Sequence, residues 1–158
     1  MNKGQETKAL ICKKLRTMLD GKLEETQSAI RSIKESRDND SKSSAGDKHE
    51  TSRAMAQIEL DKLEVQLAKM IVTRNILVGI NSQRPKQKVV PMAVGIGSLV
   101  TTNQGNYFIS IGIGKVEIDS SVYFAISLDS PIGEVLKGKV VGNQVVFQGK
   151  TFVIKDIV

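Results

Sequence analysis

The stretch SRDNDSKSSAGDKHETS, residues 36–52, contains no large apolar side chain. Its Asn, Ser and Gly residues favour turns and helix caps. On each side of it lies a long segment whose apolar residues recur at steps of three and four. A connection this short forces two helices to run antiparallel. The stretch therefore predicts a helical hairpin with its tip at about residues 38–50.

The two flanking segments are predicted as helices from about Gln5 to Arg37 and from Asp47 to Val78. The apolar or small residues of the first share one helix face; they are Ile11, Leu15, Leu19, Leu23, Thr26, Ile30 and Ile33. Those of the second have heptad spacing; they are Ala56, Leu60, Leu63, Leu67, Met70 and Leu77, and Arg74 interrupts them. Neither helix can bury its stripe alone. Residues 1–78 are therefore expected to form an antiparallel coiled-coil hairpin, about 40 Å long.

Residues 79–93, GINSQRPKQKVVPMA, end the helical pattern. Pro85 and Pro91 cannot continue a helix, and the polar, basic composition is typical of a linker. Beyond it, short segments rich in Val, Ile, Phe and Tyr are separated by Gly, Asn and Asp, as in strands. The predicted strands are Ser98–Thr102, Asn106–Gly112, Ser121–Leu128, Asn143–Phe147 and Thr151–Ile157.

One short helix interrupts these strands. Ser130 is its predicted cap, Pro131 its first residue and Gly138 its end. The fold class is therefore α+β, a helical hairpin followed by a small, mainly antiparallel sheet with one short helix. We expect residues 94–158 to bury a core of their own and to fold as a separate domain.

Several classes of protein are excluded by what the chain contains. Cys12 is the sole cysteine and His49 the sole histidine, so no internal disulfide or zinc cluster is expected. A Cys-His arrangement is not expected either, because Cys12 lies far from His49 along the helical shaft. Cys12 lies among apolar helix positions and is expected to be a buried, reduced thiol. The N-terminus lacks the apolar run of a signal peptide, and no apolar stretch is long enough for a membrane span. We expect a cytoplasmic protein that is not an enzyme and has no small-molecule substrate.

Three segments resemble the Gre-type bacterial transcript-cleavage factors. ISLDSPIGEVLKGKVVGNQVVFQGKTFVIKDI, residues 126–157, resembles the C-terminal domain of that family, with its Asp-Ser-Pro helix start and Leu-x-Gly-Lys motif. GSLVTTNQGNYFISI, residues 97–111, resembles the first hairpin of that domain, and SSAGDKHETSRAMAQIELDKLE, residues 43–64, resembles the tip and descending helix. The resemblance extends over nearly the whole chain from about Gln5. It implies an FKBP-like fold for residues 94–158.

The resemblance also implies a partner and a mechanism. Proteins of this family dock their C-terminal domain at the rim of the secondary channel of bacterial RNA polymerase, and the hairpin enters the channel. Two acids at the tip help to hold the second Mg²⁺ of the polymerase and a water that attacks the nascent RNA. Carboxylates suit this role because a hard divalent cation prefers oxygen ligands. Contact with RNA and DNA would be indirect, through the polymerase.

The tip of this chain departs from the family pattern. Aligned without gaps on His49, the two metal-holding positions are Ser41 and Ser44. The acids nearby are Asp38, Asp40, Asp47 and Glu50. Asp40 and Asp47 are the candidate pair to share the Mg²⁺ of the polymerase, because they could face each other where the chain reverses; no cofactor of the chain's own is expected. Asp47 has a second interpretation as a helix cap, stabilised by the helix dipole.

Three interpretations of the tip therefore stay open: a solvated polar loop, a loop that works through a different acid pair, and a tip that regulates without cleaving. Because the aligned positions are serines, we expect cleavage to be weak or absent.

The corner of Asp129, Ser130 and Pro131 is the candidate contact with the polymerase. Asp129 has an alternative role as a cap of the helix that follows. The alternative function for the whole chain is a coiled-coil adaptor that presents the same hairpin to another partner.

Overall fold

The computed structural model describes residues 2–40, 47–82 and 92–158, and gives only the backbone of Asp40, residues 47–49 and Ser82. The chain divides into two compact units. One is Thr17–Arg74, and the other combines Met1–Arg16 with Asn75–Val158. We call Thr17–Arg74 the hairpin unit and the other the sheet unit.

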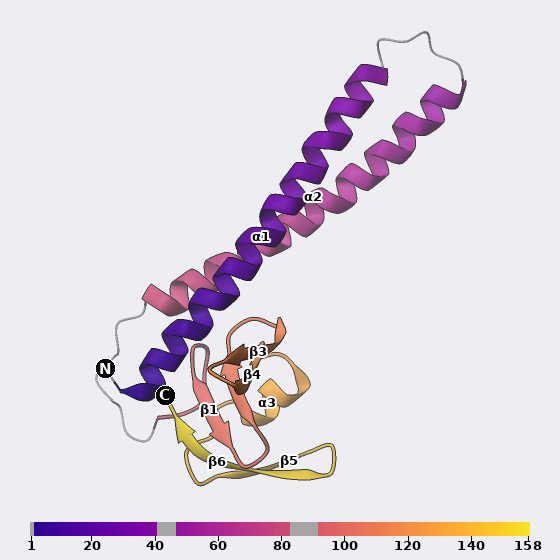
Figure 1. The fold of residues 1–158 in the computed structure, drawn as a ribbon. Coiled ribbons are helices and arrows are strands. Elements are labelled where there is room, and N and C mark those ends of the chain that lie inside the picture. The colour runs from indigo at the N-terminus through magenta and orange to yellow at the C-terminus, as the bar shows by residue number, and fades with distance from the viewer. Residues whose placement is uncertain (1, 41–46, 83–91) are drawn as a thin grey trace. The chain divides into compact units, whose positions relative to one another are not determined.

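Two long helices carry the N-terminal half, as the apolar spacing predicts. They are α1, Lys3–Asp40, and α2, Asp47–Ser82, with 38 and 36 residues (Figure 1). Every residue of both predicted stripes is buried or half-buried. α2 extends one turn beyond the predicted end at Val78. The reason is Ile80, which is buried and holds the last turn in place despite the helix-weakening Gly79 before it.

Cross-helix pairs within the hairpin unit fix the register of α1 against α2. As the residue number rises along α1, the number of its partner on α2 falls, so the helices are antiparallel. The pairs are Asp20 with Arg74 at 2.6 Å, Lys34 with Glu64 at 3.2 Å, and Arg37 with Gln57 at 3.0 Å. The pair of Asp20 with Arg74 explains why Arg74 interrupts the apolar stripe of α2. The Nε of Arg74 donates to Oδ1 of Asp20, so a charged pair stands at a seam position.

The C-terminal part of the described chain forms a six-stranded mixed sheet in the order β3-β4-β2-β1-β6-β5. Only β2 and β4 pair in parallel, and the other neighbours are antiparallel. The strands are β1 Leu99–Thr102, β2 Asn106–Ile109, β3 Gly114–Ile118, β4 Ser121–Ile126, β5 Gln144–Phe147 and β6 Lys150–Ile157. Helix α3, Pro131–Leu136, lies between β4 and β5 in sequence. The α+β class and the mainly antiparallel pairing are confirmed.

Strand β3 is absent from the sequence-based prediction, which leaves residues 113–120 unassigned. It pairs with β4 through a two-residue turn, Asp119 and Ser120, whose φ values are 47° and 64°. Both values belong to a type I′ turn, which usually contains Asn or Gly. An Asp-Ser pair gives no such signal. In contrast, the turn between β5 and β6, Gln148–Gly149, contains a glycine, and it also has two positive φ values.

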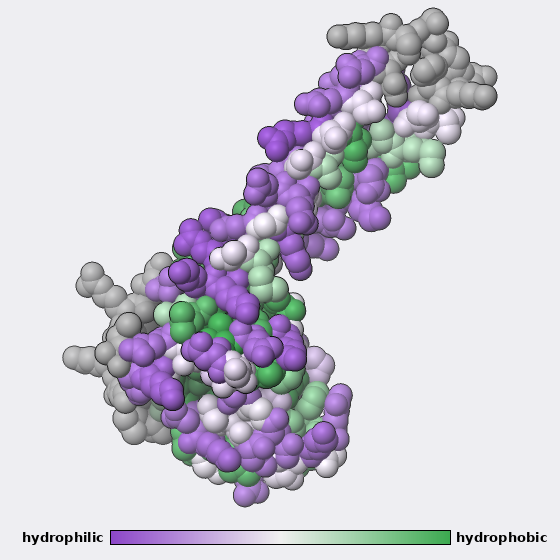
Figure 2. All heavy atoms as spheres, in the orientation of Figure 1, coloured by the Kyte–Doolittle hydropathy of each residue, from purple (hydrophilic) through white to green (hydrophobic). Residues whose placement is uncertain are grey.

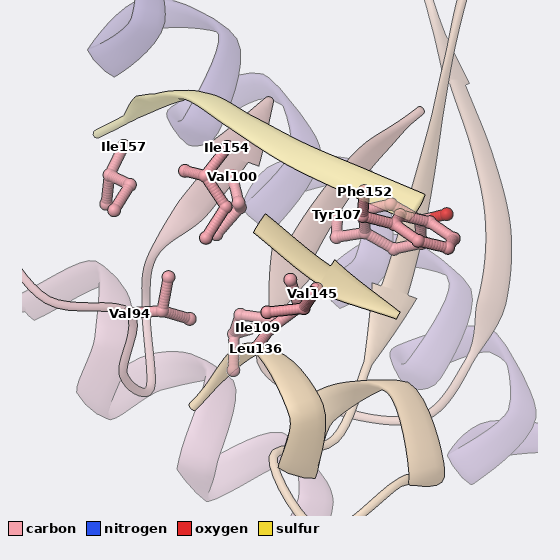
Figure 3. Close-up of a cluster of buried hydrophobic side chains, with 9 residues drawn as sticks. All are labelled: Val94, Val100, Tyr107, Ile109, Leu136, Val145, Phe152, Ile154 and Ile157. Atoms are coloured by element: carbon pink, nitrogen blue, oxygen red, sulfur yellow. The ribbon is translucent and has the colours of Figure 1, made fainter. Parts of the chain in front are cut away.

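One face of the sheet carries a hydrophobic core with α3 (Figure 3). Side chains from β1, β2, β5, β6 and α3 converge there, and Val94 joins them from the segment before β1. The core residues are Val94, Val100, Tyr107, Ile109, Leu136, Val145, Phe152, Ile154 and Ile157. Two backbone hydrogen bonds hold Val94 in place, from its N–H to the carbonyl of Lys139 and from the N–H of Gly138 to its carbonyl.

The opposite face of the sheet is buried as well. Leu99, Phe108 and Ala125 are cross-strand neighbours and all three are buried. The ends of both long helices belong to the same unit and contribute Ile11, Cys12, Leu15, Leu77 and Ile80, all buried. Contacts join these helix ends to the sheet.

The contacts between helix ends and sheet come from both long helices. Lys14 Nζ donates to the carbonyl oxygen of Glu117 at 2.7 Å. The side chain of Ile80 packs against the backbone at Gly97. The compact sheet unit is thus larger than residues 94–158, because it includes helix ends on which one face of the sheet depends.

Among the described residues, no helix combines the length and the apolar composition that crossing a bilayer requires.

Candidate functional site

The two candidate metal ligands stand at the facing ends of the long helices. Asp40 is the last residue of α1 and Asp47 the first of α2. Their side chains, the intervening residues 41–46 and the side chain of His49 lie outside the described residues. The backbone therefore places both acids at the helix boundaries around the tip. Within residues 2–40, 47–82 and 92–158, no group of His, Cys, Asp or Glu side chains is arranged to hold a metal ion.

A shallow groove crosses the hairpin unit next to the tip. Its walls include two arginines, Arg37 from α1 and Arg53 from α2, and two serines, Ser36 and Ser52. The remaining lining residues are Ile33, Ala56 and Glu59. Arg37 is fixed by a hydrogen bond to Oε1 of Gln57 at 3.0 Å and an ion pair with Asp38 at 3.5 Å. The pairing register of the helices brings Arg37 opposite Arg53.

The Asp129-Ser130-Pro131 corner begins helix α3 as predicted. Ser130 is the N-cap, since its Oγ accepts a hydrogen bond from the N–H of Gly133 at 3.1 Å and donates to the carbonyl of Ser127 at 2.7 Å. Pro131 occupies the first helical position. Ser130, and not Asp129, therefore provides the side chain that caps the first turn of α3.

Asp129 is exposed, and its carboxylate has no partner among the residues that the structure describes. Of the three corner residues, Asp129 and Pro131 are exposed and Ser130 is half-buried, and Asp129 is the one that carries a charge.

Gly133 is a residue that sequence reasoning passed over. It is buried in the first turn of α3, where an added Cβ would overlap the carbonyl oxygens of Ser127 and Leu128 and approach Ser130 Oγ. Only glycine allows the helix to lie this close to the strand end before it. The signal in the sequence is the glycine itself, placed where a helix former would be expected.

We predict that Gly133→Ala destabilises the protein by about 3 kcal/mol. The added methyl group must displace the Ser127–Leu128 backbone and disturb the cap. Urea denaturation followed by circular dichroism measures the loss. Gly112→Ala is the matched control, because nothing lies within 4 Å of a Cβ there and its φ is not positive. Equal stabilities of the two variants would contradict the close approach.

Cys12 is buried and free, as expected. Burial raises the pKa of the Cys12 thiol, and burial also lowers the pKa of the neighbouring Lys8. A thiol with a raised pKa stays protonated near neutral pH and is a poor nucleophile. Cys12 is therefore a packing residue of the sheet unit.

The geometry offers a long antiparallel helix pair with acids at its end and an exposed acid at the α3 corner. The resemblance to Gre-type factors rests on the sequence segments described above. Comparisons of this chain with family models, with curated proteins and with solved structures find no match.

Proposed function

We propose that this chain is a Gre-type factor that binds bacterial RNA polymerase in the cytoplasm. In this proposal the hairpin enters the secondary channel, and residues 94–158, with an FKBP-like fold, dock at its rim. The observation that carries the proposal is the hairpin itself. α1 alone has 38 residues and is about 57 Å long, and the sequence from residue 36 to residue 52 contains no large apolar side chain.

The tip regulates transcription in this proposal and contributes little or no RNA cleavage. Asp40 and Asp47 are the acids available to share the Mg²⁺ of the polymerase, which would be the only metal involved. Serines stand at the two positions where the resemblance expects metal ligands. A protein of this kind would occupy the channel and compete with cleavage factors.

We predict that RNA release from backtracked elongation complexes in Mg²⁺ is weak with the wild-type chain. Competition with an active cleavage factor should nevertheless be retained, because it depends on channel occupancy. The measurement compares the wild type with Asp40→Ala and Asp47→Ala. Strong release that either substitution abolishes would contradict the regulatory interpretation and assign catalysis to that acid.

Binding to RNA polymerase tests the docking part of the proposal. Asp129→Lys should weaken binding on the order of tenfold, since it reverses an exposed charge at the proposed contact. Its melting curve should be nearly unchanged because Asp129 does not cap α3. Asp156→Lys, another exposed acid of the sheet unit, is the control. Failure of the wild type to bind polymerase at all would refute the proposed function.

A second candidate function is a coiled-coil adaptor that acts on another partner. The observation that favours it is an apolar surface on α2 that the hairpin does not use. This surface is also compatible with contact inside a channel. Co-purification with polymerase separates the two functions.

A further inference from the structure

Helix α2 carries a second apolar stripe, on the side away from α1. Ile58, Val65 and Val72 make up this outer stripe, and they are 68%, 56% and 59% exposed. At 100° per residue they lie roughly opposite the seam residues Leu60 and Leu67. Figure 2 shows hydrophobic side chains gathered over the part of α2 nearer the tip, among polar ones.

The spacing of the outer stripe indicates a helical partner. A two-helix hairpin in water normally has a polar outer face, with apolar residues confined to its seam. Here three large apolar residues recur every seven positions, which keeps them in line along one side of a coiled coil. Met55, one turn before Ile58, extends the apolar surface and is also exposed.

The residue types at these positions favour a pair of helices. Ile58, Val65 and Val72 are all β-branched, the residue type that favours two strands over three or four in parallel coiled coils. The α1 side of the helix is already occupied, so the new contact would join α2 to a helix outside the hairpin unit.

Charges beside the stripe suggest which helix this is. Three residues after Ile58 comes Asp61, and four residues after it comes Lys62, so the two lie on opposite sides of the stripe. One heptad later the same places hold Ala68 and Lys69. All four side chains are exposed. One edge of the stripe, the acidic edge, thus carries Asp61, and the other, the basic edge, carries Lys62 and Lys69. The single acid of one copy can therefore pair with a lysine of another.

Symmetry decides the direction of such a pair. In a parallel dimer with its two-fold axis along the helices, the acidic edge of one copy meets the basic edge of the other. Asp61 then faces Lys62 of the second copy, twice per dimer. In an antiparallel dimer centred on Val65, like edges meet, which places Lys62 beside Lys69 of the second copy. Like charges at this distance are unfavourable.

We propose that the outer stripe is a homodimer interface, in which α2 packs in parallel and in register against α2 of a second copy. Ile58, Val65 and Val72 each face their own counterpart, as an isologous interface requires. This inference does not rest on binding to polymerase. It concerns the same shaft, so a dimer and an inserted hairpin exclude one another.

Sedimentation equilibrium over a range of protein concentrations tests the interface. The wild type should show a monomer–dimer equilibrium. Val65→Gln should raise the dimer dissociation constant on the order of tenfold or more, because it removes an apolar contact from both copies. Val141→Gln changes another exposed valine, outside the stripe, and should have no effect.

A charge-swap experiment tests the orientation. Asp61→Lys alone and Lys62→Asp alone each place like charges opposite one another in the parallel homodimer and should weaken it. An equimolar mixture of the two variants should form a heterodimer, because every facing pair then has opposite signs. Asp61 accepts a hydrogen bond from Gln57, so circular dichroism must show that both variants keep their helix content.

Each other outcome overturns the proposal. A wild-type monomer at all concentrations, with Val65→Gln weakening capture of RNA polymerase, would assign the stripe to the polymerase. If the wild type is a monomer and Val65→Gln does not weaken capture of RNA polymerase, the stripe is neither a dimer interface nor a polymerase contact. If Val65→Gln does not change the dissociation constant of the dimer, the dimer interface lies outside the outer stripe. A dimer in which Lys62→Asp strengthens self-association is antiparallel.

Discussion

Leu60→Asp is expected to unfold the hairpin unit at room temperature. Leu60 is 1% exposed, and burying an unpaired carboxylate in the seam costs about 4 kcal/mol or more. The helices of residues 17–74 have no other core, because their stability comes from packing one stripe against the other. Hydrogen exchange followed by mass spectrometry should show loss of protection in residues 17–74.

The matched control is Ile58→Asp, the same kind of change two positions earlier on the same helix. Ile58 is exposed, so its replacement should alter the free energy of unfolding by about 0.5 kcal/mol or less at dilute, monomeric concentrations. Equal losses in the two variants would mean that α2 does not present Leu60 to α1.

A fragment of residues 92–158 is expected to lose cooperative unfolding. Without the helix ends, the face of the sheet that bears Leu99, Phe108 and Ala125 is open to water. Removing the cover from a fully buried phenylalanine forfeits several kcal/mol by itself, on the scale of about 3–5 kcal/mol for a Phe-to-Ala change. The expected product is a compact but loosely packed state that binds a hydrophobic dye.

The control for this fragment keeps both helix ends. Residues 17–74 are deleted, and a short Gly-Ser linker joins Arg16 to Asn75. This chain retains the complete sheet unit and should melt cooperatively in calorimetry. A cooperative melt of the bare 92–158 fragment would show that the core on the α3 face is sufficient alone, as the strand pattern first indicated.

The local features of the fold were readable because each depends on neighbours in the sequence. Apolar residues at steps of three and four predicted both helices, and Ser130-Pro131 predicted the start of α3. Strand β3 was missed because Val116 is its single fully buried side chain and its turn contains no glycine. The parallel pairing of β2 with β4 depends on β3 at the sheet edge, so it was missed with it.

The non-local features could not be read in this way. The stripe of α1 looks the same from Ile11 to Ile33, yet its first part belongs to the sheet unit and its later part to the hairpin unit. Periodicity states which face of a helix is buried but not what covers it. The candidate site divides similarly. Asp129 was a candidate because of its place before the predicted cap, whereas the Arg37–Arg53 groove required the helix register.

The sheet unit is built from segments on both sides of the hairpin unit in sequence, and this fixes an order of events on the ribosome. The hairpin unit can form as soon as α2 has emerged. The sheet unit must wait for β6, which lies between β1 and β5 in the sheet and pairs with both. During that interval Ile11 and Leu15 have no sheet to cover them. Translation therefore leaves an apolar helix end without its sheet for several seconds, at about 5–20 residues per second, and we expect a nascent-chain chaperone to bind this end during that interval.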